Sequence, residues 1–264
     1  MSSADRDHQY LHESGRLFYT GCERPKYAGR FAAYSASQPT YSLADIFAKI
    51  TAGYGSLFGL VWTILDQGEK PWCWDYSATQ CMMLAIRALF GEKVLLDTSC
   101  GPIVTGVRGG NSIDAMLQEV QLVTGQPSAG FVGSDPTQAV TVRRLPSGWQ
   151  MNAALRKAIK WLALSTPEDL ASALINGHPC VFGINWQGGG HALCVAEVSA
   201  LNGALIFAGP NSWSLAFDCG WGSYPGRPGW YQLTAAQCSD AFGQFGCYAL
   251  VGVTDAAADE PVEV

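Results

Sequence analysis

The chain has 264 residues, which is enough for one medium domain or two small ones. Apolar residues make up 48% of it, and this excludes a disordered or collagen-like chain. Basic residues number 16 against 22 acidic ones, for a formal charge of −6 without any basic stripe, so we expect binding neither to nucleic acid nor to a membrane.

The N-terminus shows no targeting signal. Residues Met1–His8 contain no apolar stretch of the kind found in a secretory signal peptide. The apolar run Ile50–Leu65 is interrupted by glycines and is too short for a membrane span. We therefore expect a cytoplasmic protein, or one that belongs to a particle assembled inside the cell.

Residues 1–41 show no sustained periodicity and predict an irregular arm. Ser42 with Asp45 is typical of a helix start, and Thr166 followed by Pro167 is typical of another. The segment 73–90 is almost uncharged, so its helix should be buried on most sides. The predicted helices are 42–50, 73–90, one that starts at Asn111 with Asp114 in its first turn, 150–164 and 166–177.

Short apolar runs replace the helical pattern after Gly177. The pair Asn202-Gly203 is a strong signal for a hairpin turn between two of them. Helices first and strands second indicate an α+β protein with two lobes. The predicted strands are 179–185, 191–200, 204–208, 229–234 and 247–253.

Nine cysteines are present, and none forms a CxxC pair, which excludes a zinc ribbon. Without a signal peptide we expect reduced thiols, most of them small core residues. A disulfide that involves Cys219 or Cys238 stays open at this point.

Cys73 is placed for nucleophilic chemistry. It begins the 73–90 helix, where unpaired backbone N–H groups and the positive end of the dipole lower the pKa of a thiol. Gln67 lies six residues earlier, and Trp74 follows. This pattern resembles the papain-like cysteine proteases, and the Trp72-Cys73 pair also resembles staphopain-type relatives.

The resemblance extends to the partners of Cys73. His191 begins an apolar strand after three glycines, as the family's catalytic base does, and Asn211-Ser212-Trp213 resembles the segment that orients this base. The resemblance implies a Cys73–His191–Asn211 triad with Gln67 as an oxyanion donor. It further implies substrate contacts by Gly109, Gly110 and Trp221, and it implies no metal and no cofactor.

Several positions depart from the family pattern. The usual disulfide is absent, because Lys70 and Val107 stand in place of its two cysteines. Asp75 replaces a small residue, and its charge is expected to raise the pKa of Cys73 unless backbone N–H groups at the helix start bind it. Only about 50 residues precede the resemblance, too few for a long helical pro-segment.

These observations predict a papain-like two-lobed fold, with a helical lobe, an antiparallel β-barrel-like lobe and the active site in the cleft between them. The expected domains are an arm at 1–56, irregular with one short helix, a peptidase domain at 57–253, and an acidic disordered tail at 254–264. The helical lobe would span about 57–150, and the β lobe about 165–253.

The expected function is that of a cysteine endopeptidase that cleaves a protein or peptide substrate through a thioester acyl-enzyme. Two alternatives stay open. One is a transamidase or amidase that uses the same triad. The other is a non-catalytic papain-like module for binding or assembly, which Asp75 and the missing pro-segment favour.

Overall fold

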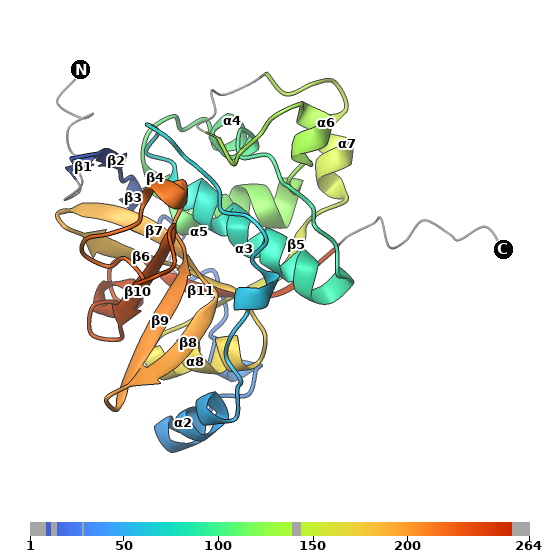
Figure 1. Ribbon diagram of the computed structural model, residues 1–264. Helices are drawn as coiled ribbons and strands as arrows, with labels where there is room; N and C mark the ends of the chain where they lie inside the picture. Colours follow the sequence, from blue (N-terminus) through green and yellow to red (C-terminus); the bar gives the residue numbers. More distant parts are fainter. Residues whose placement is uncertain (1–8, 12–14, 28, 139–143, 255–264) are drawn as a thin grey trace.

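Most helices lie on one side of the molecule and pack against antiparallel sheets on the other, while the helices Leu43–Thr51 and Pro167–Ile175 lie on the side of the sheets (Figure 1). The computed structural model describes residues 9–11, 15–27, 29–138 and 144–254. The α-helices are α2 Leu43–Thr51, α3 Cys73–Phe90, α4 Cys100–Thr105, α5 Ile113–Ala115, α6 Ala129–Val132, α7 Trp149–Ala154 and α8 Pro167–Ile175. A π-helix, Met116–Thr124, continues α5, and short 3-10 helices lie at Tyr34–Ala36, Phe58–Leu60, Ser214–Ala216 and Ser239–Phe242.

The strands in the described part of the chain form four sheets. The largest has the order β5-β11-β6-β7, the next has the order β10-β9-β8, and both are antiparallel. Both are open sheets, so within the described residues the predicted barrel-like lobe is two sheets and not a closed barrel. Their strands are β5 Ala158–Ala163, β6 Cys180–Trp186, β7 Gly189–Val195, β8 Glu197–Leu201, β9 Ala204–Pro210, β10 Trp230–Thr234 and β11 Cys247–Val253.

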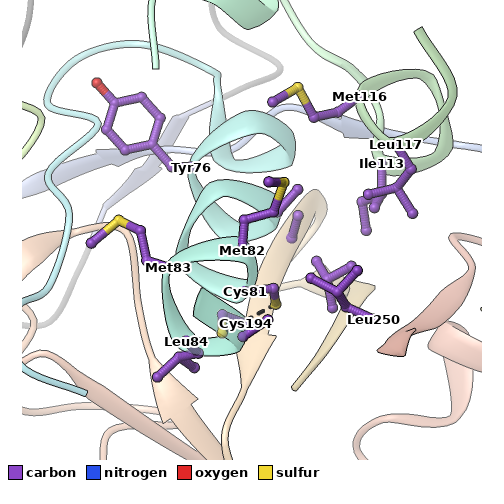
Figure 2. Packing of buried hydrophobic residues seen from close by; sticks show 14 of the residues in the cluster. Tyr76, Cys81, Met82, Met83, Leu84, Ile113, Met116, Leu117, Cys194 and Leu250 are labelled. Carbon is purple, nitrogen blue, oxygen red and sulfur yellow. Dashed lines mark hydrogen bonds between the residues drawn. The ribbon is translucent and has the colours of Figure 1, made fainter. Parts of the chain in front are cut away.

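Helix α3 passes between the helical side and the larger sheet, and its first fourteen residues are buried. Figure 2 shows its Met82 and Cys81 facing residues of the π-helix segment, β7 and β11. The sulfur of Cys81 lies 3.3 Å from that of Cys194 in β7. Gly91 ends the helix with φ +76°, a left-handed conformation that glycine adopts without strain. This packing fixes the first turn of α3 beside β7.

Two predicted helices differ from the structure. The helix expected at 150–164 is instead the short α7 followed by strand β5, which pairs with β11. The helix expected to start at Asn111 begins two residues later, because Asn111–Ser112 forms strand β4. In both cases pairing with a distant strand determines the local structure.

The N-terminal arm, predicted to be irregular, contributes three short strands. Strands β1 Gln9–Leu11 and β2 Leu17–Tyr19 pair with each other, and β3 Cys22–Glu23 runs parallel to β4. The arm therefore lies on the body of the protein, on the same side as β4 and β7 (Figure 1).

Some expectations concern the rest of the chain. Cys238 is a buried free thiol, so it forms no disulfide. The predicted tail falls outside the described residues except for Thr254, whose N–H donates to the carbonyl of Lys157. In the part of the chain that the structure covers, we find no helix with the length and apolar character needed to cross a bilayer.

Candidate active site

Cys73 and Ala192, the residue after His191, come together where α3 meets β7. The hydroxyl of Ser77, one turn into α3, donates to the carbonyl of Ala192 at 2.7 Å. The N–H of Ala192 in turn lies on the Cys73 sulfur. Cys73 is fully buried, and burial raises the pKa of its thiol to about 11, although the N–H groups of Ala192 and Gly21 act in the opposite direction. The sulfur is therefore a neutral thiol in this state.

His191 is oriented by Asn211. The imidazole Nε2 lies 2.9 Å from the amide Oδ1 of Asn211, and because an amide oxygen only accepts, Nε2 carries the proton. Nδ1 then keeps a lone pair, and no described residue hydrogen-bonds to it. Burial lowers the pKa of His191 to about 3, so the ring is neutral. Trp213 stacks on it at 4.2 Å between ring centres.

Gln67 is near this group, but its amide is already engaged. Its Nε2 donates to the carbonyls of Tyr19 and Lys70, at 2.8 and 2.6 Å, and its Oε1 accepts from the hydroxyl of Ser212 at 2.5 Å. The indole N–H of Trp213 also donates to the Tyr19 carbonyl, at 3.0 Å. The Tyr19 carbonyl, which belongs to the arm, therefore accepts a hydrogen bond from the Gln67 amide that was expected to stabilise an oxyanion.

The arm crosses directly over Cys73. The N–H of Gly21 contacts the sulfur and also donates to the Gly190 carbonyl at 2.9 Å, while the Gly21 carbonyl accepts from Asn111 at 2.9 Å. A Cβ built on Gly21 would lie 2.1 Å from the carbonyl oxygen of Pro71. Only glycine fits this position, and the arm as a whole buries the thiol.

Gly109 and Gly110 directly precede the strand that pairs with the arm, and their expected contacts with substrate stay a prediction. Asn111, and not Gly109 or Gly110, receives the arm, because Cys22 lies opposite Asn111. The Gly109 carbonyl accepts from the indole of Trp74 at 3.3 Å. Trp221 packs edge-on against Trp186, at 4.8 Å between ring centres, and so belongs to the aromatic cluster around His191.

Asp75 does not behave as either sequence hypothesis expects. Its carboxyl is fully buried, and burial together with the nearby Asp97 holds its pKa well above the usual range, which favours the neutral, protonated form. Its hydrogen-bond partner is the hydroxyl of Thr79 at 3.2 Å and not a backbone N–H group. The negative charge expected beside Cys73 is therefore disfavoured.

Sequence reasoning missed the residues that the arm brings to the site, chiefly Tyr19, Gly21 and Cys22. The one available signal was the run of small residues Thr20-Gly21-Cys22 directly after the aromatic pair Phe18-Tyr19, which is typical of a chain that passes through a narrow space. Among the described residues, no group of three or more histidine, cysteine or acidic side chains is arranged to hold a metal ion.

Comparison with known proteins gives a structural result only. No protein-family model matches this sequence, and a search of curated proteins finds no match either. Solved structures match over most of the chain. Xylellain, a cysteine protease from Xylella fastidiosa, has a TM-score of 0.68 at 13% identity and covers 89% of this chain and 96% of its own.

Two zymogens are also similar. Procathepsin L2 proteinase from the Tenebrio molitor larval midgut has a TM-score of 0.62 at 15% identity, covering 95% of this chain and 80% of its own. ProCathepsin B S9 from Trypanosoma congolense has a TM-score of 0.60 at 14% identity, covering 87% and 85%. At these identities the likeness concerns architecture, and this chain has the papain-like two-lobed α+β fold.

Proposed function

We propose that this protein is a cysteine peptidase, specifically an endopeptidase, with Cys73 as nucleophile and His191 as general base. The observation that carries the proposal is the orientation of His191, whose Nε2 is held by Asn211 while the Nδ1 lone pair has no partner. A nucleophile, a base and a residue that orients the base are the parts that acyl transfer needs.

In the proposed reaction the Cys73 thiol gives its proton to His191 Nδ1, and the sulfur bonds to the carbonyl carbon of a peptide. The C–N bond then breaks, the leaving amine takes the proton from His191, and a thioester remains. Water, deprotonated by His191, attacks the thioester and releases the acid and the free thiol. Gln67 Nε2 and the Cys73 N–H would bind the oxyanion once the Tyr19 carbonyl has left.

We further propose that the described state is latent. The arm buries Cys73, occupies the Gln67 amide and runs along the edge that would receive a peptide. A substrate competes with the arm for these positions, so the observed activity scales with the fraction of molecules whose arm is displaced.

The test uses Gly21→Val, because a side chain at this position collides with the Pro71 carbonyl and prevents the arm from seating. The variant is expected to hydrolyse an unstructured protein such as casein, and to be alkylated at Cys73 by iodoacetamide near pH 6, at least about tenfold faster than the wild type. Gly130→Val is the matched control, because Gly130 has open space around it and no positive φ.

Adding Cys73→Ala or His191→Ala to Gly21→Val is expected to abolish hydrolysis, and the triple variant should be no worse than either double variant, since residues of one catalytic unit are not additive. The diverted Gln67 amide and the covered thiol favour the alternative of a non-catalytic module. A Gly21→Val chain that alkylates readily at Cys73 but cleaves nothing would support that alternative and exclude the peptidase.

A further inference from the structure

Three polar residues in β4 and just after it form a group of hydrogen-bond acceptors that the arm covers. We call Asn111, Ser112 and Asp114 the acceptor cluster; each is at most 1% exposed. The Asp114 carboxylate accepts from the N–H groups of Lys26 at 3.0 Å and Tyr27 at 2.5 Å. The Lys26 ammonium donates to Asn111 Oδ1 at 2.5 Å, and the Ser112 hydroxyl has no hydrogen-bond partner in the described part of the chain.

To the side-chain oxygens of Asn111 and Asp114 the arm thus brings donors, one of them cationic. The arm also brings two acceptors nearby, since the Gly21 carbonyl accepts from the Asn111 N–H at 2.9 Å and Glu23 pairs with the Lys26 ammonium at 3.4 Å. When the arm leaves, Asp114 loses both N–H donors and Asn111 loses the ammonium. Leaving the buried Asp114 carboxylate without hydrogen-bond donors costs free energy. A ligand that replaces the arm therefore binds better if it carries positive charge and N–H groups.

The acceptor cluster adjoins the reacting sulfur. Gly21 contacts Cys73, and the next residue, Cys22, lies opposite Asn111. The Cys22 side chain fills a pocket between Gly183 and Phe245, since a Cβ built on Gly183 would be 2.7 Å from its sulfur and 2.5 Å from the Phe245 Cβ. A peptide that follows the same path reaches the acceptor cluster within a few residues of the bond at Cys73.

We infer that, in the arm-free cleft, the acceptor cluster binds a cationic nitrogen of a peptide substrate, with Asp114 as the specificity-determining residue. The nitrogen belongs to a lysine or arginine side chain, or to a free amino terminus, within a few residues of the cleaved bond. This inference rests on the proposed peptidase function and specifies its substrate class.

The experiment compares fluorescent hexapeptides in the Gly21→Val chain. Each peptide is N-acetylated and carries a single lysine or norleucine at one position, and a second set has free amino termini. At the preferred position kcat/KM is expected to be at least about tenfold higher for lysine, and Asp114→Asn is expected to bring this ratio close to one. If kcat/KM instead rises only when the amino terminus is free, whether lysine or norleucine is present, the amino terminus is the source of the cation.

Glu119→Gln is the matched control. Glu119 is another acid that holds the arm, through the Tyr27 hydroxyl at 2.5 Å, but it is outside the acceptor cluster. If Asp114 only anchors the arm, Asp114→Asn and Glu119→Gln would change kcat/KM for all peptides alike and leave the ratio intact. Should Asp114→Asn fold poorly, Asp114→Glu keeps the charge and is expected to retain a preference for lysine.

Binding separates this inference from the proposed function. Fluorescence anisotropy of the same peptides with the Cys73→Ala, Gly21→Val chain requires no catalysis. A lysine preference that Asp114→Asn removes would support the inference even if no peptide were cleaved. Equal affinity for lysine and norleucine peptides at every position, with acetylated and free termini alike, would overturn it even if hydrolysis were efficient.

Discussion

At the scale of single residues, the site illustrates how burial controls ionisation. Cys73 and His191 are both fully buried, and burial shifts their pKa values in opposite directions, to about 11 and about 3. In this state Cys73 is therefore a neutral thiol and His191 a neutral imidazole.

The buried Asp75 carboxyl should make the free energy of unfolding depend on pH. Its native pKa is raised, whereas in the unfolded chain it is about 4, so the native state holds a proton that the unfolded state releases. The free energy of unfolding should therefore fall as pH rises above about 4, by at most about 1.4 kcal/mol per pH unit. Asp75→Asn removes this dependence, and its gain in Tm over the wild type should be larger at pH 7 than at pH 4.

Thermal unfolding followed by circular dichroism measures this difference, with the exposed Asp218→Asn as control. A Tm difference that is the same at both pH values would show that Asp75 ionises normally in the folded protein. The acidic limb of kcat/KM in the Gly21→Val chain should be unchanged by Asp75→Asn, because the raised pKa of Asp75 keeps its carboxyl protonated, and so uncharged, in that acid range.

At the scale of elements, local signals predicted the structure where local interactions determine it. Ser42 and Thr166 accept N–H bonds from the third residue after each, as helix caps do, and α3 begins and ends at the expected residues. Asn202 and Gly203 have φ values of +51° and +77°, as the hairpin signal requires.

Long-range pairing explains the errors. Residues 150–164 have the composition of a helix, but strand β5 exists because β11, about ninety residues later, offers a partner. The arm strands are two or three residues long, and each depends on a partner that no local pattern identifies. The sequence alone singled out Gln67, Cys73, His191 and Asn211 as candidate site residues, because their spacing resembles a known family. It did not predict that the arm lies over them.

Strand β2 packs against the candidate site through Phe18, and this contact predicts the effect of Phe18→Ala. Phe18 is buried and stacks on Trp213, with ring centres 4.7 Å apart. Removing a buried phenylalanine side chain costs about 2 kcal/mol. If this loss destabilises only the state in which the arm covers the site, the fraction of molecules with a displaced arm rises by roughly thirtyfold. The alkylation rate of Cys73 near pH 6 should rise accordingly.

Leu17→Ala, one residue earlier and 44% exposed, is the matched control and should change the rate less than about twofold. Peptide mapping after alkylation identifies the modified thiol and separates Cys73 from the exposed Cys219. Equal alkylation rates for Phe18→Ala and the wild type would mean that β2 does not hold the arm over the sulfur.

At the scale of the whole molecule, seating of the arm is linked to protonation. With the arm in place the pKa of His191 is about 3, whereas a solvated histidine has a pKa near 6.5. Below about pH 6.5 the arm-free state therefore binds a proton that the arm-covered state excludes, and each pH unit of acidification down to about 3 favours displacement by up to tenfold. The Cys73 thiol is protonated in the arm-covered state throughout this range. The effect holds where Cys73 remains a thiol after the arm leaves, because a thiolate formed there would release the proton that His191 gains.

We therefore expect acid to displace the arm, and the reaction of Cys73 with a dipyridyl disulfide, which stays reactive in acid, measures this. The rate in the wild type is divided by the rate in Gly21→Val at the same pH, because in that variant the arm is displaced and only the chemistry varies. This ratio should rise as pH falls from 7 to 4.5, while circular dichroism shows that the fold persists. The ratio should rise in Asp114→Asn as well, since His191 and not the carboxylate under the arm takes up the proton. A ratio that stays constant from pH 7 to 4.5 would mean that His191 can be protonated without moving the arm, and acid release would then be wrong.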